Sequence, residues 1–280
     1  MKWQRAMGSA VTVSLVVGAG GNIHAACEDG KIYTLDPNGA EVWQYETGSR
    51  LVGTPSVGQD GSIYFGAENG MIYALDKMGN LRWTHKTAGL IASSPAVGEN
   101  GNVYVAGQDG TLYALGADGS ELWTFTVPNV GTIAGSLLVS PAIGLDGRIY
   151  AGALYQSTLY ALNPGDGSVA WYNNTLPGKG IFAAPVVGAD GTIYLNTLDD
   201  PKLHALNPAN GAVVWAVNLA DYAGGWFEGG AESLGICAYT EPAVGPDGTI
   251  YVSFDDPYLR AVNPEGTIRW VRRLGMVGGF

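Results

Sequence analysis

Short runs of alternating apolar and polar residues, separated by glycine-centred turns, follow one another along the whole chain. Runs such as Ile63-Tyr64-Phe65 and Tyr73-Ala74-Leu75 have the length and the β-branched and aromatic content of strands rather than of helices. Asp-Gly and Asn-Gly pairs between the runs supply the positive φ that a tight hairpin needs, so they predict antiparallel neighbours. The pattern therefore predicts an all-β protein.

The runs recur with a period of forty residues. Each repeat contains four of them, which we name A (around a Pro), B (Gly-x-Ile-Tyr), C (Tyr-Ala-Leu) and D (Trp). Tryptophan marks the period: the first four D residues are 40 apart, and the later separations are 48, 44 and 55 residues, for Trp at positions 3, 43, 83, 123, 171, 215 and 270. Four-stranded units of this length are typical of β-propeller blades.

We expect one β-propeller domain over residues 1–280. Its repeats cover 1–36, 37–76, 77–116, 117–163, 164–207 and 208–263, with a last strand at 264–273. Runs A to C occur six times but run D occurs seven times, because Lys2-Trp3 aligns with Arg82-Trp83. Two arrangements stay open: six blades close directly and the spare D strand lies along an edge, or the chain is a fragment of a seven- or eight-bladed propeller.

The first residues allow a second interpretation. Lys2 and Arg5 precede an apolar stretch at 10–17, as in a signal peptide. However, residues 14–36 align without a gap with residues 54–76 of the next repeat. We therefore favour a strand, and no other stretch approaches the roughly 18 apolar residues of a membrane span.

The composition of the chain excludes some classes of partner and of site. The net charge is −11 with a pI near 4.6, whereas nucleic-acid binding draws much of its affinity from clustered Lys and Arg. Nucleic acid is therefore not an expected partner. Cys27 and Cys237 are too few and too far apart for a disulfide framework or a zinc site.

The repeat resembles a known motif. Tyr-Ala-Leu-Asp/Asn, then x-x-Gly, then x-x-x-Trp is similar to the tryptophan-docking repeat of the PQQ-like (pyrroloquinoline quinone) repeat propellers, in the quinoprotein alcohol dehydrogenase superfamily. The match is best at 75–83 and 162–171 and extends over almost the whole chain. The resemblance implies that the indoles are buried between blades as structural docking residues, namely Trp43, Trp83, Trp123, Trp171, Trp215 and Trp270.

The chemistry of the quinoprotein enzymes does not carry over. The resemblance would imply a disulfide between adjacent cysteines stacked on the quinone, a Trp stacked on its other face, a calcium site and an Asp base. In this chain Cys27 and Cys237 are not neighbours. We assign no catalytic or cofactor-binding residue, and we find no Ser/His/Asp arrangement. His24, His85 and His204 each fill a repeat position, so packing is their expected role.

Insertions distinguish the two sides of the blades. Because strands alternate in direction, the A–B and C–D turns share one side, and they are short and uniform. The B–C and D–A connections share the other side and carry every insertion: Val127–Leu138, Thr175–Ile181, Leu219–Thr240, Ala153–Ser157, Asn196–Lys202 and Phe254–Pro257. Function commonly resides in variable loops on a rigid scaffold, so we expect this side to bind the partner.

These insertions contain the candidate site residues. The candidates for partner binding are Tyr155, Lys179, Tyr222, Trp226, Phe227, Glu228, Glu232 and Tyr239. Weak candidates for a cation site are Asp199, Asp200, Asp255 and Asp256, since Ca²⁺ prefers several oxygen ligands. Asp-Asp-Pro is also ordinary turn chemistry, and Trp226 could simply pack within its own loop.

The function expected from these observations is a non-catalytic scaffold whose insertion-rich side binds a protein, peptide or polysaccharide. It resembles the non-catalytic branch of the family, which includes the propeller lipoprotein of the bacterial outer-membrane assembly machinery. The alternative is a fragment of a PQQ-dependent dehydrogenase that requires PQQ and Ca²⁺. The resemblance favours a periplasmic or extracellular location.

Overall fold

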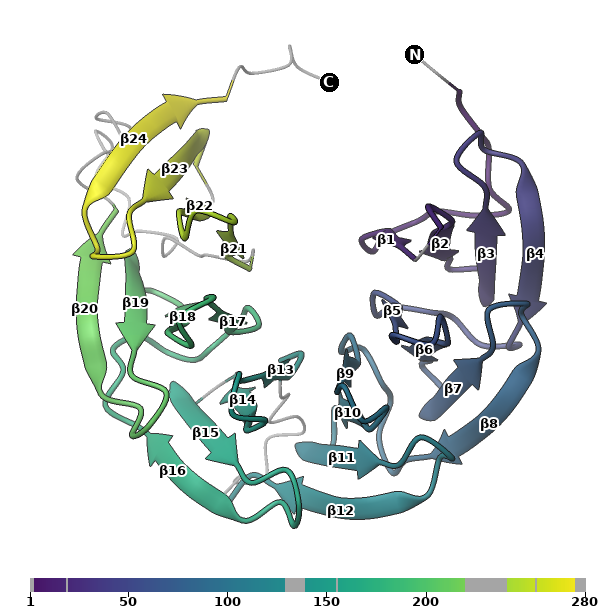
Figure 1. The fold of residues 1–280 in the computed structure, drawn as a ribbon, viewed down its shortest axis with the longest axis horizontal. Coiled ribbons are helices and arrows are strands. Elements are labelled where there is room, and N and C mark those ends of the chain that lie inside the picture. Colours follow the sequence, from purple (N-terminus) through teal and green to yellow (C-terminus); the bar gives the residue numbers. More distant parts are fainter. Residues whose placement is uncertain are drawn as a thin grey trace. The chain divides into compact units, whose positions relative to one another are not determined.

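The computed structural model describes residues 3–18, 20–128, 139–154, 156–219, 241–254 and 256–274. Within these ranges the regular structure consists of strands, arranged as six four-stranded antiparallel sheets (Figure 1). Each sheet follows the chain order A, B, C, D. The predicted all-β class is therefore confirmed, and these ranges include no helix with the length and apolar character to span a membrane.

The described residues divide into two compact units. The first comprises Met1–Pro141 together with Gly165–Gly167. Its three sheets contain β1 (Val16–Val17), β2 (Ile23–Ala26), β3 (Lys31–Leu35), β4 (Glu41–Glu46); β5 (Ser56–Val57), β6 (Ile63–Gly66), β7 (Met71–Leu75), β8 (Leu81–Lys86); and β9 (Ala96–Val97), β10 (Val103–Ala106), β11 (Thr111–Leu115), β12 (Glu121–Thr126).

The second unit comprises Ala142–Pro164 and Ser168–Phe280. Its three sheets contain β13 (Ala142–Ile143), β14 (Ile149–Ala153), β15 (Thr158–Leu162), β16 (Val169–Asn173); β17 (Val186–Val187), β18 (Ile193–Asn196), β19 (Lys202–Leu206), β20 (Val213–Asn218); and β21 (Ala243–Val244), β22 (Ile250–Ser253), β23 (Tyr258–Val262), β24 (Ile268–Arg273).

The core lies between neighbouring sheets of a unit. In the first unit, Tyr64, Ile72 and Ala74 of one sheet pack against Val103 and Leu115 of the next. Strands B and C supply most of the fully buried residues, whereas the D strands alternate between exposed and half-buried positions. Each D strand is the last in its sheet, which explains this alternation.

In the first five sheets, the tryptophan of the D strand reaches the C–D turn of the following sheet. Trp83 Nε1 donates a hydrogen bond to the carbonyl oxygen of Ala117 at 3.0 Å, and its ring lies on Gly119. A Cβ at Gly119 would lie 2.7 Å from that ring, and the backbone there has φ +83°, so only glycine fits. The same contact joins Trp3 to Gly39, Trp43 to Gly79, Trp83 to Gly119, Trp123 to Gly167, Trp171 to Gly211 and Trp215 to Gly266.

The expected burial of the indoles is wrong for most of them. Trp123 is 8 % exposed, but the other five predicted docking residues are half-buried: Trp43, Trp83, Trp171, Trp215 and Trp270. The indole lies beneath a turn at the outer strand rather than between the central strands. One edge of the ring therefore stays in contact with solvent.

The predicted spare strand around Trp3 is also absent. Residues 3–15 contain no strand, and no described strand forms a hydrogen-bond ladder with them. Trp3 nevertheless donates to the carbonyl oxygen of Pro37 at 3.0 Å, and Arg5 forms an ion pair with Glu41 at 2.5 Å. Farther on, Val16 pairs with His24 in β1 and β2, as the strand interpretation predicts.

Candidate functional site

The B–C and D–A connections of the second unit lie together. The segment that follows β16 hydrogen-bonds to the loops after two different B strands. Ser157 Oγ donates to the carbonyl oxygen of Gly178 at 2.9 Å, the Lys179 amide donates to Leu198 at 2.9 Å, and the Leu198 amide donates to Gly180 at 2.8 Å. These bonds support the prediction, made from strand direction, that the B–C and D–A connections lie on the same side of the blades.

Most of the predicted contact residues lie outside the described residues. Tyr155 and the candidates of the 219–240 insertion lie outside the described residues, and so does Asp255: the insertion candidates are Tyr222, Trp226, Phe227, Glu228, Glu232 and Tyr239. The described candidates are Lys179, Asp199, Asp200 and Asp256. The site is therefore built from these four residues and from the side chains that hold them.

Arg260 fixes the start of the long insertion. It is 1 % exposed, although it carries a charge, and it lies on β23. Its NH1 and NH2 groups donate to both carboxylate oxygens of Asp256 at 3.0 and 2.5 Å, and its Nε donates to the carbonyl oxygen of Leu219 at 3.2 Å. Leu219 is the first residue of the insertion and the only one of its residues that the structure describes. The guanidinium therefore ties a B–C loop to the segment from which the insertion departs.

Aromatic rings complete the environment of this arginine. Its Cζ lies 5.5 Å from the ring centre of Phe254 and 5.7 Å from that of Tyr258. Guanidinium groups are attracted to the faces of such rings. A buried arginine thus has a bidentate carboxylate, a backbone acceptor and two rings, which together compensate for its loss of water.

Asp200 forms a second buried pair one sheet earlier. Its Oδ2 lies 2.8 Å from His204 Nε2, and both side chains are almost completely buried. Lys202 Nζ lies 3.7 Å from the other carboxylate oxygen. Burial lowers the pKa of His204, although Asp200 acts in the opposite direction. The arrangement therefore holds this loop in place with the acid and the imidazole both buried.

Asp199 points to a different partner. Its carboxylate lies 2.6 Å from Lys179 Nζ, and the lysine side chain is 77 % exposed. Asp199 also has φ +62°, an unusual value for a residue other than glycine. Asp199, Asp200 and Asp256, the described residues of the proposed cation site, thus each already have a cationic partner. The described residues also contain no group of three or more His, Cys, Asp or Glu suited to a metal ion.

The same carboxylate position recurs in earlier repeats. Asp29 accepts a hydrogen bond from Tyr33 Oη, and Asp109 accepts one from Tyr113 Oη, both at 2.7 Å. Asp200–His204 and Asp256–Arg260 have the same spacing of four residues. Sequence reasoning found Asp200 and Asp256 but missed their partners, which the recurring Asp-x-x-x-Tyr spacing could have revealed.

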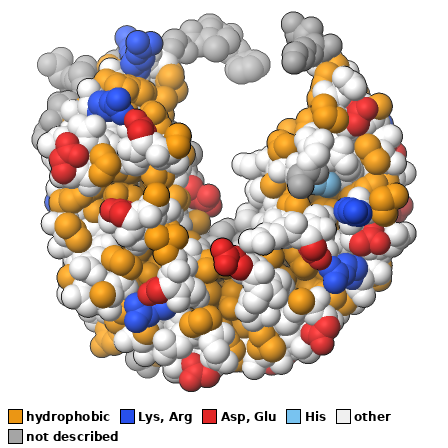
Figure 2. Space-filling view, viewed as in Figure 1, with side chains coloured by type: hydrophobic (Ala, Val, Ile, Leu, Met, Phe, Trp, Pro, Cys, Tyr) orange, Lys and Arg blue, Asp and Glu red, His pale blue; other side chains and the backbone are white. Residues whose placement is uncertain are grey.

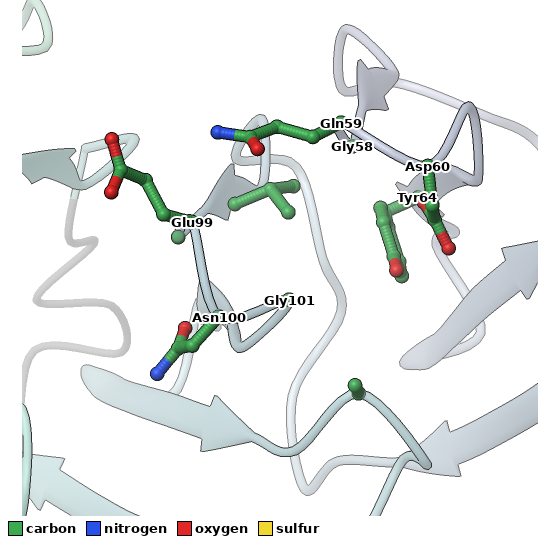
Figure 3. A pocket seen from close by; sticks show the side chains of 10 residues that line it. Gly58, Gln59, Asp60, Tyr64, Glu99, Asn100 and Gly101 are labelled. Carbon is green, nitrogen blue, oxygen red and sulfur yellow. The ribbon is translucent and has the colours of Figure 1, made fainter.

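The other face of the repeat contains a pocket. A surface pocket of about 240 Å³ lies between the A–B turns of the two sheets β5–β8 and β9–β12, where Gln59, Asp60, Glu99 and Asn100 line it (Figure 3). Asp60 is already bound to Arg82 at 2.7 Å. Figure 2 shows Lys, Arg, Asp and Glu side chains interspersed over the face that it presents. The pocket offers polar groups but not a paired nucleophile and base.

Cys27 is a free, completely buried thiol. Burial, with a smaller contribution from Asp29, raises its pKa to about 11. The thiol is therefore protonated at neutral pH and is a poor nucleophile. Cys27 follows β2 as Ala67 follows β6 in the next repeat. This position therefore requires a small side chain that packs in the core.

Repeated four-stranded antiparallel sheets, linked by an indole on a glycine turn, define a β-propeller built from PQQ-like repeats. A family model described as outer membrane protein assembly factor BamB matches residues 2–216 and 139–278. The chain belongs to this family. A search of curated proteins found no match.

A solved structure supports the same fold. The crystal structure of BamB from Moraxella catarrhalis is similar, with a TM-score of 0.72 and 18 % sequence identity. The match covers 93 % of this chain and 75 % of that chain. At this level of identity the likeness concerns the fold.

Proposed function

We propose that the protein is a non-catalytic scaffold that binds a protein partner within an outer-membrane assembly system, in the periplasm. Membership of the family supports the class of function. The observation that carries the proposal for this chain is the contrast between its two sides. The A–B and C–D turns are uniform, while the B–C and D–A connections vary in length, are joined by hydrogen bonds, and contain buried Asp–His and Asp–Arg pairs.

The buried Asp256–Arg260 pair supports the presentation of the long insertion to a partner. Arg260 joins Asp256 to the carbonyl oxygen of Leu219, so the start of the insertion is fixed by its backbone and by residues outside it. A fixed base lowers the entropy that the loop loses when it binds. The proposed contact residues are the insertion aromatics Tyr222, Trp226, Phe227 and Tyr239, with Tyr155, Glu228 and Glu232, and with Lys179 as the described cation. Large aromatic side chains commonly anchor protein interfaces.

A deletion tests this proposal. Residues 223–231 are replaced by a short Gly/Ser bridge, and the variant is compared with the parent for its melting temperature and for the proteins that co-purify from envelope extracts. The matched control replaces Gln59 and Glu99 with Ala on the A–B side. We expect the deletion to abolish co-purification while the melting temperature is retained, and we expect the control to keep its partner. Lost stability with unchanged partners would show that the insertion is only a structural cover.

A further inference from the structure

The pocket between the A–B turns of β5–β8 and β9–β12 is a space that a later repeat fills with its own side chains. Its volume is about 240 Å³. The equivalent space lies at Gly191, in the sheet β17–β20. A Cβ at Gly191 would lie 3.7 Å from Leu145 Cδ1 and 3.6 Å from Pro208 Cγ. The repeat can therefore close this space with two hydrocarbon groups.

These two hydrocarbon groups are missing at Gly101. Apart from its chain neighbours, a Cβ there would meet a single atom within 4 Å, the Cβ of Ala117 at 3.1 Å. Gln59 stands where Leu145 does in the later repeat. Ala117 stands at a turn position that the other repeats fill with a larger residue: Pro37, Lys77, Pro164, Pro208 and Pro264. The pocket is therefore open, and Val97 and Ala117 form part of its wall.

The polar part of the wall is negatively charged. Asp60 and Glu99 line the pocket, and its lining includes no Lys or Arg. Asp60 already forms an ion pair with Arg82, which lies outside the lining, whereas Glu99 forms no ion pair within the described part of the chain. In Figure 3 the Gln59 side chain extends from its turn toward Glu99. One uncompensated carboxylate and an amide oxygen suit a ligand that has one positive charge and several N–H donors.

The size and chemistry of the pocket disfavour other ligands. Its volume is below the roughly 300–1,000 Å³ of sites for drug-sized ligands, so the ligand has few heavy atoms. A metal ion is disfavoured because the part of the chain that the structure describes has no group of three or more His, Cys, Asp or Glu suited to one. Glu99 would repel an anion. A polyol would place hydroxyl groups against the apolar side chains of Val97 and Ala117.

We propose that this pocket binds a small free amine. The compact hydrocarbon part of the amine takes the place that the Leu145 side chain and the Pro208 ring occupy in the later repeat, against Val97 and Ala117. Its ammonium group pairs with the carboxylate of Glu99. The pocket lies among the A–B turns and not on the insertion side, so this site does not depend on the proposed protein partner.

Titration followed by NMR tests the site. Cyclopentylamine, which carries an ammonium group on a proline-sized ring, is added to the full chain while the amide signals of Gly98 and Gly101 are recorded. Cyclopentanol is the uncharged comparison, and Nα-acetyl-lysine amide represents a lysine side chain of a protein. Two variants change the pocket: Glu99→Gln removes the charge, and Ala117→Pro adds the ring found in other repeats. The matched control is Lys77→Pro, the same change one repeat earlier and outside the lining.

We expect cyclopentylamine to shift both signals in a saturable way and to bind about tenfold or more tightly than cyclopentanol. Glu99→Gln should weaken this binding by about fivefold or more. Ala117→Pro should abolish it at an unchanged melting temperature, and Lys77→Pro should retain it.

Four results would each overturn the proposal. They are the absence of a saturable shift, equal binding of cyclopentanol, and undiminished binding to either Glu99→Gln or a folded Ala117→Pro variant. The fourth is tighter binding of Nα-acetyl-lysine amide than of cyclopentylamine, which would assign the pocket to a protein side chain instead of a free amine. If Ala117→Pro fails to fold, the comparison of the parent with Glu99→Gln decides alone, because Glu99 is exposed on a turn.

Discussion

Replacement of Arg260 is the sharpest test of how the insertion side is held in place. Arg260→Ala removes two donors to Asp256, the bond to the Leu219 carbonyl oxygen and the contacts with Phe254 and Tyr258. It also leaves a carboxylate that is only 13 % exposed without its cation. Breaking a buried pair in this way costs about 3–5 kcal/mol, of which the ring contacts account for roughly 0.5–2 kcal/mol.

The expected magnitude can be measured by thermal unfolding. A loss of about 3–5 kcal/mol lowers the melting temperature by roughly 6–20 °C for a domain of this size class. The matched variant is Arg260→Tyr, because Tyr33 and Tyr113 donate to Asp29 and Asp109 at the same spacing. We expect it to recover most of the loss. An Arg260→Ala variant that melts within 1 °C of the parent, or an Arg260→Tyr variant that is less stable than Arg260→Ala, would refute the reasoning.

Three further predictions address packing, pH and cofactors. Trp83→Ala should lower the unfolding free energy by about 2–4 kcal/mol, somewhat less than the roughly 3–5 kcal/mol of a fully buried indole, because Trp83 is only half-buried. The lost hydrogen bond to Ala117 is part of this cost. Chemical denaturation of Trp83→Ala and of Trp83→Phe, in which an aromatic ring remains, measures the effect. Burial lowers the pKa of His24, so the unfolded state binds more protons; stability should be fully present above about pH 6.5 and decline as the pH falls toward the folded-state pKa. A His24→Tyr, Thr34→Ala variant, which restores the residues found at 64 and 74, should have a weaker pH dependence, and an unchanged pH profile would contradict this assignment. Addition of PQQ and Ca²⁺ should leave the absorbance spectrum as the sum of its components and produce no dye reduction with alcohols; turnover above a heat-killed control would favour the dehydrogenase alternative.

The forty-residue period made the sheets predictable. Strand identity followed from Asp-Gly and Asn-Gly turns and from the Tyr-Ala-Leu runs, because these signals are local and act within one hairpin. Burial of the indoles was less predictable. It depends on how far a neighbouring turn covers the ring, and the spacing of Trp83 and Gly119 along the chain does not specify that coverage.

The candidate site was predictable only in part. The sequence identified the variable connections and the carboxylates at 199, 200 and 256, but it did not indicate that His204 contacts Asp200 and that Arg260 forms an ion pair with Asp256. Both side chains replace a tyrosine of the repeat, and the contact with the carboxylate four residues earlier is clear once the structure places the two side chains together. The extra strand at Trp3 was predicted wrongly because alignment reports similarity of residues, whereas a strand also needs a partner.

Photo-crosslinking from single positions tests the central claim most directly. A photoreactive amino acid is placed at Lys179, whose side chain is 77 % exposed on the insertion side, or at the exposed Gln59 among the A–B turns. Each variant is irradiated in envelope extracts of the source cells. The account predicts a discrete crosslinked protein from position 179 and none from position 59. Crosslinks from position 59 alone would contradict it.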